Sequence, residues 1–67
     1  MTIIDMKAIL HDYLIMNGYR PEGKGYMIKD ELQMDAFDEH GKFRLFRISP
    51  KDVLSTFVIS KRKWVKI

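Results

Sequence analysis

Residues 26–49 read YMIKDELQMDAFDEHGKFRLFRIS, and this stretch decides the fold because a turn signal separates two apolar runs. Asp38 suits the first position of a turn, and Gly41 can adopt a positive φ at its end. Four-residue hairpin loops are commonly built around such a turn. We therefore predict an antiparallel β-hairpin with residues 38–41 as its loop.

A loop at 38–41 also sets the register of this hairpin, since it pairs Phe37 with Lys42 and the further pairs run outward. Because side chains alternate along a strand, one face of the hairpin then carries the apolar residues of a core. These residues are Ile28, Leu32, Met34, Ala36, Phe43 and Leu45. The other face carries residues that we expect to be solvated: Lys29, Glu31, Gln33 and Asp35, opposite Arg44.

Three features of this stretch leave alternatives open. Phe46 and Ile48 fall on the polar face, so either a bulge near Leu45 resets the alternation or both sheet faces are partly covered. The sequence KDE at 29–31 can break the first strand in two. Part of 28–37 is also compatible with a helix, because Glu, Leu, Gln, Met and Ala are helix formers. The turn signal leads us to favour strands.

The N-terminal segment predicts an amphipathic helix over about 3–17. Thr2 is the N-cap and Asp5 follows three residues on, which is a loose capping box at the positive end of the helix dipole. Apolar residues at helical spacing form one stripe: Ile3, Met6, Ile9, Leu10, Tyr13 and Leu14. We expect Gly18 to end the helix in the left-handed conformation and Tyr19 to pack back on the last turn.

Residues 20–25, RPEGKG, predict a loop between the helix and the hairpin. Pro21 restricts the residue before it to extended conformations, and the two glycines make the rest of the segment flexible. A Gly-x-Gly with a lysine also resembles part of a phosphate-binding loop. That loop needs a strand before it, a helix after it and a Lys-Ser/Thr pair, whereas here the helix comes first. We therefore expect a plain connector.

The sequence SPKD is typical of a helix start, with Ser49 as the cap, Pro50 at the first helical position and Asp52 in the first turn. The residues after it form one helical stripe: Val53, Leu54, Phe57, Val58, Lys61, Trp64 and Val65. The stretches TFVIS and WVKI are nevertheless rich in β-branched and aromatic residues, which favour strands. The C-terminal part is therefore either one helix of about 50–62 or a short helix followed by a strand, and we expect the single helix.

The expected fold is a small two-layer α+β domain with the order α-β-β-α, with or without one further short strand. An N-terminal and a C-terminal helix would cover one face of the antiparallel hairpin. A chain of 67 residues has no room for a second core, so residues 1–67 should form a single domain.

The composition is that of a globular protein, because 46% of the residues are hydrophobic and 31% are charged. The absence of cysteine excludes disulfides and thiolate metal sites. No apolar run approaches the roughly 18 residues of a membrane span. The beginning, MTIIDMKAIL, lacks the basic region and cleavage site of a signal peptide. We expect a cytoplasmic monomer or homodimer with no membrane partner.

The net charge of +3 conceals a difference between the two halves of the chain. Residues 1–41 contain four cations and eight anions, whereas residues 42–67 contain eight cations and one anion. Either the halves neutralise each other across a sheet, or the second half forms a basic surface that binds a polyanion. The fold decides between these two interpretations.

The sequence contains no recognisable catalytic or metal-binding group of residues. His11 falls in the predicted helix and His40 in the predicted turn, so they do not supply converging metal ligands. The serines have no adjacent His-Asp pair, and the carboxylates of the hairpin are typical of surface ion pairs. A chain of this size also has little room to enclose a substrate. We expect no enzymatic activity, no metal and no cofactor.

The predicted layout resembles that of the HicA-type toxin family, small RNA-cleaving proteins with the shape of a double-stranded-RNA-binding domain. The residues that carry the resemblance are NGY at 17–19, GKG at 23–25 and HGK at 40–42. That family places Gly-Ser-His at the first strand, where this chain has GYMI. His40 lies in the turn and does not replace the missing catalytic histidine, so the resemblance does not imply RNA cleavage by this chain.

The C-terminal sequence ISKRKWVKI contains most of the candidate binding residues. Cations bind phosphate and tryptophan can stack on an unpaired base, which suits a nucleic acid. Tryptophan and arginine are also enriched in protein interfaces, which suits a groove on a partner protein. Alternatively, Trp64 packs on the N-terminal helix and the cations are simply solvated. The candidate site residues are Arg44, Arg47, Lys61, Arg62, Lys63 and Trp64.

We predict a small non-enzymatic regulatory or accessory module that binds a protein, by analogy with the inhibitors and adaptors encoded by bacteria and phages. The alternative is a nucleic-acid-binding protein that uses the basic second half. The positions of Arg44 and Arg47 discriminate between the two. A single basic face favours nucleic acid, whereas pairing of these arginines with Asp35 and Glu31 favours a protein partner.

Overall fold

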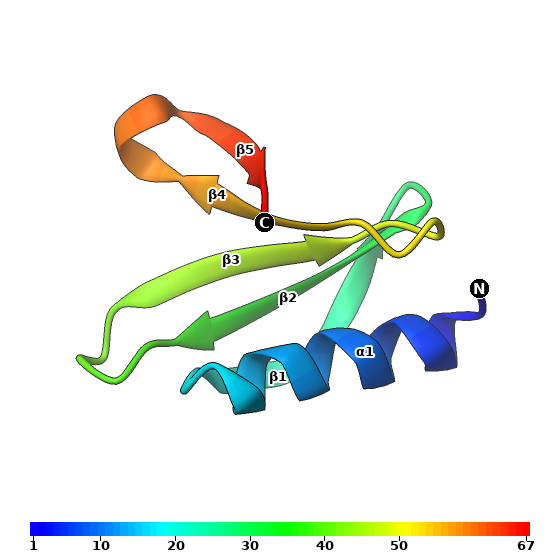
Figure 1. Cartoon of the computed structure of the whole chain (residues 1–67), viewed down its shortest axis with the longest axis horizontal. Coiled ribbons are helices and arrows are strands. Elements are labelled where there is room, and N and C mark those ends of the chain that lie inside the picture. The colour runs from blue at the N-terminus through cyan, green and yellow to red at the C-terminus, as the bar shows by residue number, and fades with distance from the viewer.

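The computed structural model describes all 67 residues and consists of one N-terminal helix followed by a five-stranded antiparallel sheet (Figure 1). Helix α1 spans Ile3–Met16, and the strands are neighbours in the sheet in their order along the chain. The strands are β1 (Arg20–Ile28), β2 (Glu31–Phe37), β3 (Phe43–Ile48), β4 (Leu54–Val58) and β5 (Lys63–Lys66), with a 3-10 turn η1 (Ile59–Lys61) before β5. No helix follows the sheet, so the predicted order α-β-β-α is wrong.

Helix α1 and its caps form as predicted. The Thr2 hydroxyl accepts the N–H of Asp5 at 3.1 Å, and the Asp5 carboxylate accepts the N–H of Thr2 at 3.3 Å. At the other end, Gly18 has a φ of 81° and the N–H of Tyr19 donates to a carbonyl of the last turn at 2.9 Å. This closure directs the ring of Tyr19 back onto the core, 4.9 Å from the ring of Phe46.

The core lies between α1 and the sheet face that the helix covers across β1, β2 and β3 (Figure 1). Its buried side chains are Met6, Leu10, Leu14, Leu32, Met34, Ala36, Phe46 and Ile48. The three from α1 are spaced by four residues and therefore lie along one line of the helix. The three from β2 alternate along the strand, as predicted for its core face.

The β2–β3 hairpin pairs one residue away from the predicted register. Phe37 faces Phe43 instead of the lysine before it. Because successive side chains point to opposite faces, this shift exchanges the two faces of β3. Phe46 and Ile48 face the helix and are buried without any bulge. Phe43 and Leu45, predicted as core residues, lie on the opposite face.

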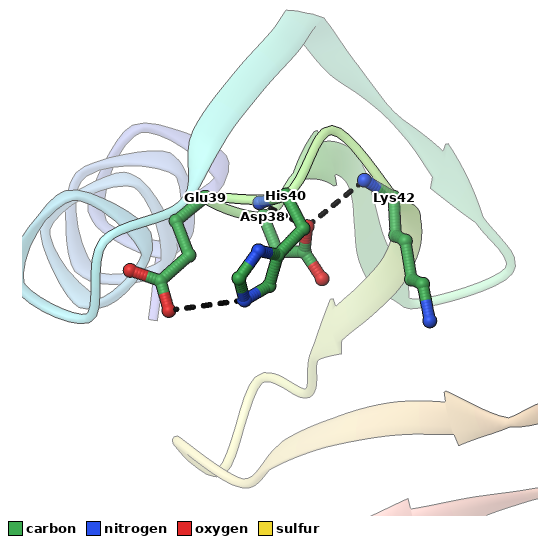
Figure 2. Close-up of polar contacts among 4 residues, drawn as sticks. All are labelled: Asp38, Glu39, His40 and Lys42. Carbon is green, nitrogen blue, oxygen red and sulfur yellow. Dashed lines mark hydrogen bonds and ion pairs between the residues drawn. The ribbon is translucent and has the colours of Figure 1, made fainter.

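The loop between these strands explains the shift (Figure 2). The N–H of Asp38 donates to the carbonyl of Lys42 at 2.9 Å, so three residues separate this closing pair instead of four. Gly41 completes the loop with a φ of 78°. The Asp38 carboxylate accepts the N–H groups of Lys42 at 2.9 Å and His40 at 2.8 Å, and chiefly the bond from Lys42 lowers the pKa of Asp38. Glu39 and His40 form an exposed ion pair of 3.5 Å beside this clamp.

The sequence SPKD forms a second hairpin loop of the same kind, not a helix start. The N–H of Ser49 donates to the carbonyl of Val53, and that of Asp52 to the carbonyl of Ser49, both at 3.0 Å. The Ser49 hydroxyl accepts the N–H groups of Lys51 and Val53 at 3.2 Å. Asp52 has a left-handed φ of 65°, which no helix tolerates. The predicted helix of 50–62 is therefore replaced by β4 and η1, and the resemblance to the HicA-type layout loses its final helix.

Residues 20–25, predicted as a connecting loop, belong to β1. Their first part pairs with the end of β2, and after an irregularity the pairing resumes where Tyr26 faces Gln33. Gly25 has a φ of 79° inside this irregularity, and a side chain there would meet the Gln33 carbonyl at 3.0 Å. Only glycine therefore allows the two backbones to approach. The break at 29–31, which the sequence left open as an alternative, is present, since β1 ends at Ile28 and β2 begins at Glu31.

The substitution Leu10→Ala should lower the free energy of unfolding by about 2–5 kcal/mol, because it leaves a cavity under the helix. A core of this size supplies only about 3–5 kcal/mol, so the variant should be largely unfolded. A urea titration followed by far-UV circular dichroism measures the change. Ile4→Ala is the matched control on the same helix, because Ile4 is 79% exposed. An unchanged urea midpoint for Leu10→Ala would contradict this packing.

The clamp at Asp38 predicts a pH-dependent stability. The folded-state pKa of Asp38 lies below its ordinary value of 3.8, so the carboxylate stabilises the fold above that pH. The contribution disappears as the pH falls through the lower folded-state pKa. The melting temperature of Asp38→Ala should therefore lie below that of the unsubstituted protein at neutral pH, and the gap should close in strong acid. Glu39→Ala is the control in the same loop, and a gap independent of pH would disprove the role of the charge.

Candidate functional site

The sheet face opposite α1 is covered by no other element (Figure 1). We call it the open face, and from β2 to β5 the register places on it five large apolar side chains: Phe37, Phe43, Leu45, Phe57 and Trp64. The rings of Phe37 and Phe43 lie 5.4 Å apart, and those of Phe57 and Trp64 lie 5.6 Å apart. Phe43 is 49% exposed and the other four are half-buried. The open face is therefore an apolar surface without a partner in this chain.

A row of polar contacts crosses the open face beside these rings. The Gln33 amide donates to the Tyr26 hydroxyl at 2.8 Å and to the Asp35 carboxylate at 3.2 Å. The Arg47 Nε–H donates to the Gln33 amide oxygen at 3.0 Å. The Arg47 guanidinium then lies over Trp64, 4.1 Å from the ring centroid. We call Tyr26, Gln33, Arg47 and Trp64 the polar row, which links β1, β2, β3 and β5.

Gln33 is the centre of this row and is only 5% exposed, although we predicted a solvated position. Both ends of its amide have partners, so its burial leaves no unpaired polar atom. Arg47 is held on two sides, by the amide oxygen and by the tryptophan ring, which fixes its long side chain. Sequence reasoning missed Tyr26 and Gln33 because only the cross-strand register brings them to Arg47.

The structure does not bring the two predicted arginines together. Arg47 lies on the open face, whereas Arg44, paired with Ala36, lies on the face that carries α1. There its positive charge partly opposes the effect of burial, which raises the pKa of Tyr13. Neither arginine forms an ion pair, and Asp35 faces Leu45 instead of Arg44. Neither of the two predicted arrangements is therefore present. The arginines do not form a single basic face, and they are not paired with carboxylates of the hairpin.

The other candidate residues lie in and after the turn between β4 and β5. Lys61, Arg62 and Lys63 are all exposed, and Arg62 occupies the left-handed position of the turn with a φ of 52°. Trp64 follows on the open face and not on the helix, so the alternative in which it packs against α1 is wrong. The turn therefore presents three cations at one end of the sheet, next to the aromatic pair of Phe57 and Trp64.

Charge divides the open face into two parts. The β1 and β2 side carries carboxylates, with Glu22 directly opposite Asp35. The β3 to β5 side carries cations, with Arg47 and Lys66 flanking Ser55 in adjacent strands. On the open face, Glu22 and Asp35 thus lie towards one end and Arg47 and Lys66 towards the other. They do not neutralise each other through ion pairs, since the pair of Glu39 and His40 is the only one present.

The chemical groups present set limits on the site. No three His, Cys, Asp or Glu side chains gather where they could hold a metal ion. None of the helical structure has the length and apolar character needed to cross a membrane. Comparison with protein-family models, curated proteins and solved structures gives no match for this chain. A functional proposal for the chain therefore depends on the open face and its surroundings.

The substitution Arg47→Ala should expose the Trp64 ring and deprive buried Gln33 of its donor. We expect acrylamide to quench Trp64 fluorescence more strongly and the free energy of unfolding to fall by about 1–3 kcal/mol. Arg44→Ala is the matched control, because Arg44 lies on the other face of the same strand. Its quenching constant should equal that of the unsubstituted protein. Equal quenching in all three proteins would show that Arg47 does not cover the ring.

Proposed function

We propose that this chain is a small non-enzymatic module that binds a partner protein through its open face. The observation that carries the proposal is the presence of five large apolar side chains, two ring pairs among them, on a sheet face that nothing covers. Small domains rarely leave a continuous apolar surface exposed unless another molecule covers it. Apolar contacts surrounded by polar groups are also the usual composition of a protein interface.

The polar row supports a protein partner in a second way. Arg47 and Trp64 are of the residue types that contribute most to binding energy in protein interfaces. Their contact with Gln33 and with each other fixes them before a partner arrives. Binding then loses less side-chain entropy than it would with free side chains. The partner that fits presents an apolar patch, with acidic groups towards the β4–β5 turn and basic groups towards β1.

Binding of nucleic acid is the less favoured function. A phosphate backbone needs several cations on one surface. Here Arg44 and Arg47 lie on opposite faces, and the carboxylates of Glu22 and Asp35 share the open face with Arg47. The exposed cations at 61–63 remain available to phosphate. A test of protein binding therefore needs a nuclease treatment.

The proposal predicts that capture of a partner from a lysate of the source cells depends on the open face. Phe37→Ser and Trp64→Ser should each reduce capture at least about tenfold, because each removes an apolar contact from the face. Met16→Ser is the matched control, because Met16 is 84% exposed on α1 and lies outside the open face. It should capture the same protein as the unsubstituted chain. Quantitative mass spectrometry of the bound proteins, with and without nuclease, measures the difference.

Two outcomes would reject the proposal. One is equal capture by the unsubstituted chain and both open-face variants, and the other is capture that nuclease abolishes. Circular dichroism establishes that each variant is folded. If Trp64→Ser does not fold, Phe37→Ser decides, because Phe37 is not part of the polar row.

A further inference from the structure

The sheet splits between β3 and β4 (Figure 1). The pairing of these strands covers only three residue pairs and ends where Phe46 faces Thr56. The β2–β3 ladder continues beyond this point to Phe43, and the β4–β5 ladder continues to Val58. We call the resulting gap the fork: it lies between residues 42–45 and residues 57–60 and contains a pocket of about 650 Å³ that is open to solvent. Such a volume is typical of sites that take up a ligand.

The fork leaves part of the backbone of β3 without a partner strand. In an antiparallel ladder, alternate residues direct both their N–H and C=O groups to the same neighbour. The bond from the N–H of Ser49 to Val53 therefore directs the backbone groups of Leu45 and Phe43 towards β4. The Leu45 carbonyl accepts the Thr56 hydroxyl at 2.8 Å. The pairing with β4 does not reach Phe43, because it ends at Phe46 and Thr56. The backbone N–H and C=O of Phe43 therefore point into the fork and have no partner in β4.

The opposite side of the fork has the same character. The N–H of Ile67 donates to the Leu54 carbonyl at 2.9 Å, which directs Leu54 and every second residue after it towards β5. Phe57 therefore directs its backbone groups towards β3. Two strand edges, at Phe43 and Phe57, face each other across a gap instead of pairing.

The side chains around the fork define what it can bind. Its apolar lining residues are Phe43, Leu45, Phe57, Val58 and Ile59. The only charged side chains in the lining are the cations Lys42 and Arg44. The exposed cations at 61–63 come directly after Ser60 at the other side. An open strand edge, an apolar lining and cations on both flanks thus occur together.

We propose that the fork binds an extended acidic peptide segment of a partner protein, which pairs with the edge of β3 at Phe43 and places an apolar side chain between the splayed strands. This inference rests on the protein-binding function proposed above and names the segment that is recognised. Addition of a strand to an open edge gives affinity through the backbone, and the lining selects alternate side chains. The flanking cations select carboxylates in the peptide.

The same features disfavour two other occupants. A nucleic acid has no backbone that continues a β-ladder, and it would leave the apolar lining unused. A second copy of this chain could offer its edge strands β1 and β5 or its own fork, and two forks would bring their lining cations Lys42 and Arg44 together. Strand β5, KWVK, is basic and would meet the cations of the fork. Strand β1, RPEGKGYMI, carries two cations and one anion and so has no excess of carboxylates.

The test titrates the ¹⁵N-labelled chain with a peptide of about eight residues in which glutamate alternates with leucine or valine, a length typical of a strand. The expected result is saturable movement of the amide signals of Phe43, Leu45 and Phe57, with a dissociation constant below about 1 mM. In an extended peptide, alternate backbone N–H groups point to opposite edges. Two isomers of the peptide carry the same number of N-methyl groups, and each isomer blocks the N–H groups of one edge only. Strand pairing requires at least one isomer to bind at least about tenfold more weakly than the unmodified peptide. Equal binding by both isomers and the unmodified peptide would overturn the inference.

Charge reversal near the fork supplies matched variants. Lys42→Glu should weaken binding of the peptide at least about fivefold, because Lys42 lines the fork. Lys24→Glu makes the same charge change at an exposed position of β1, away from the fork, and should bind like the unsubstituted chain. Equal weakening by both variants would indicate a general charge effect and would also overturn the inference.

The remaining outcomes separate this inference from the proposed function. No movement of the fork signals, with open-face-dependent capture of a protein intact, rejects the fork as the peptide site and leaves the protein-binding function standing. Movement of the same signals on dilution of the chain alone indicates a second copy and rejects the inference. Binding of an oligonucleotide of about eight nucleotides with the same signals, and not of the peptide, rejects both.

Discussion

The hydrogen bonds that Asp38 makes across its loop determine the rest of the structure. Its backbone N–H and its carboxylate both bind to Lys42, and a second bond from His40 completes the clamp. These bonds fix the closing pair of the β2–β3 hairpin and with it the register of the central strands. A shift by one residue would move Phe46 and Ile48 away from α1 and would replace them with Phe43 and Leu45. The clamp therefore decides both which side chains make the core and which make the open face.

Sequence periodicity was sufficient for the parts of the fold that depend on neighbours in the chain. The helix, its capping box and the Gly18 closure depend on contacts within five residues, and all were predicted correctly. The hairpin was also predicted, but its register was not. Loops of three and four residues share the same turn signal, and the difference between them is a single hydrogen bond at Asp38. The apolar character of Phe46 and Ile48, which a four-residue loop placed on the polar face, was the available clue that this loop length was wrong.

The C-terminal half shows a second ambiguity of local signals. A serine whose hydroxyl accepts the N–H two residues later can begin a helix or close a hairpin, and Pro50 suits both. The β-branched residues after Asp52 decide in favour of strands, and the left-handed φ of Asp52 is the structural consequence. The candidate site was harder to predict from the sequence than the fold. The exposed positions of Lys61, Arg62 and Lys63 result from their turn, whereas the contact of Arg47 with Gln33 and Trp64 joins three strands and has no signature in the sequence.

The β4–β5 hairpin raises a question of stability that bears on function. None of the buried residues comes from residues 54–66, although ordering each residue costs about 1–2 kcal/mol. An isolated two-stranded hairpin is marginal in water. This one is attached to the remaining sheet through three residue pairs, the Thr56 hydroxyl and the contact of Arg47 with Trp64. From this hairpin the partly buried Leu54 packs against the core, so core packing accounts for only a small part of its stability. The hairpin supplies instead two of the five apolar side chains of the open face, Phe57 and Trp64, and one wall of the fork. A weakly held hairpin beside a fork can move as a unit, since local opening concentrates where few contacts are buried. The same segment thus combines few buried contacts with the apolar and basic groups that the proposed partner protein would contact.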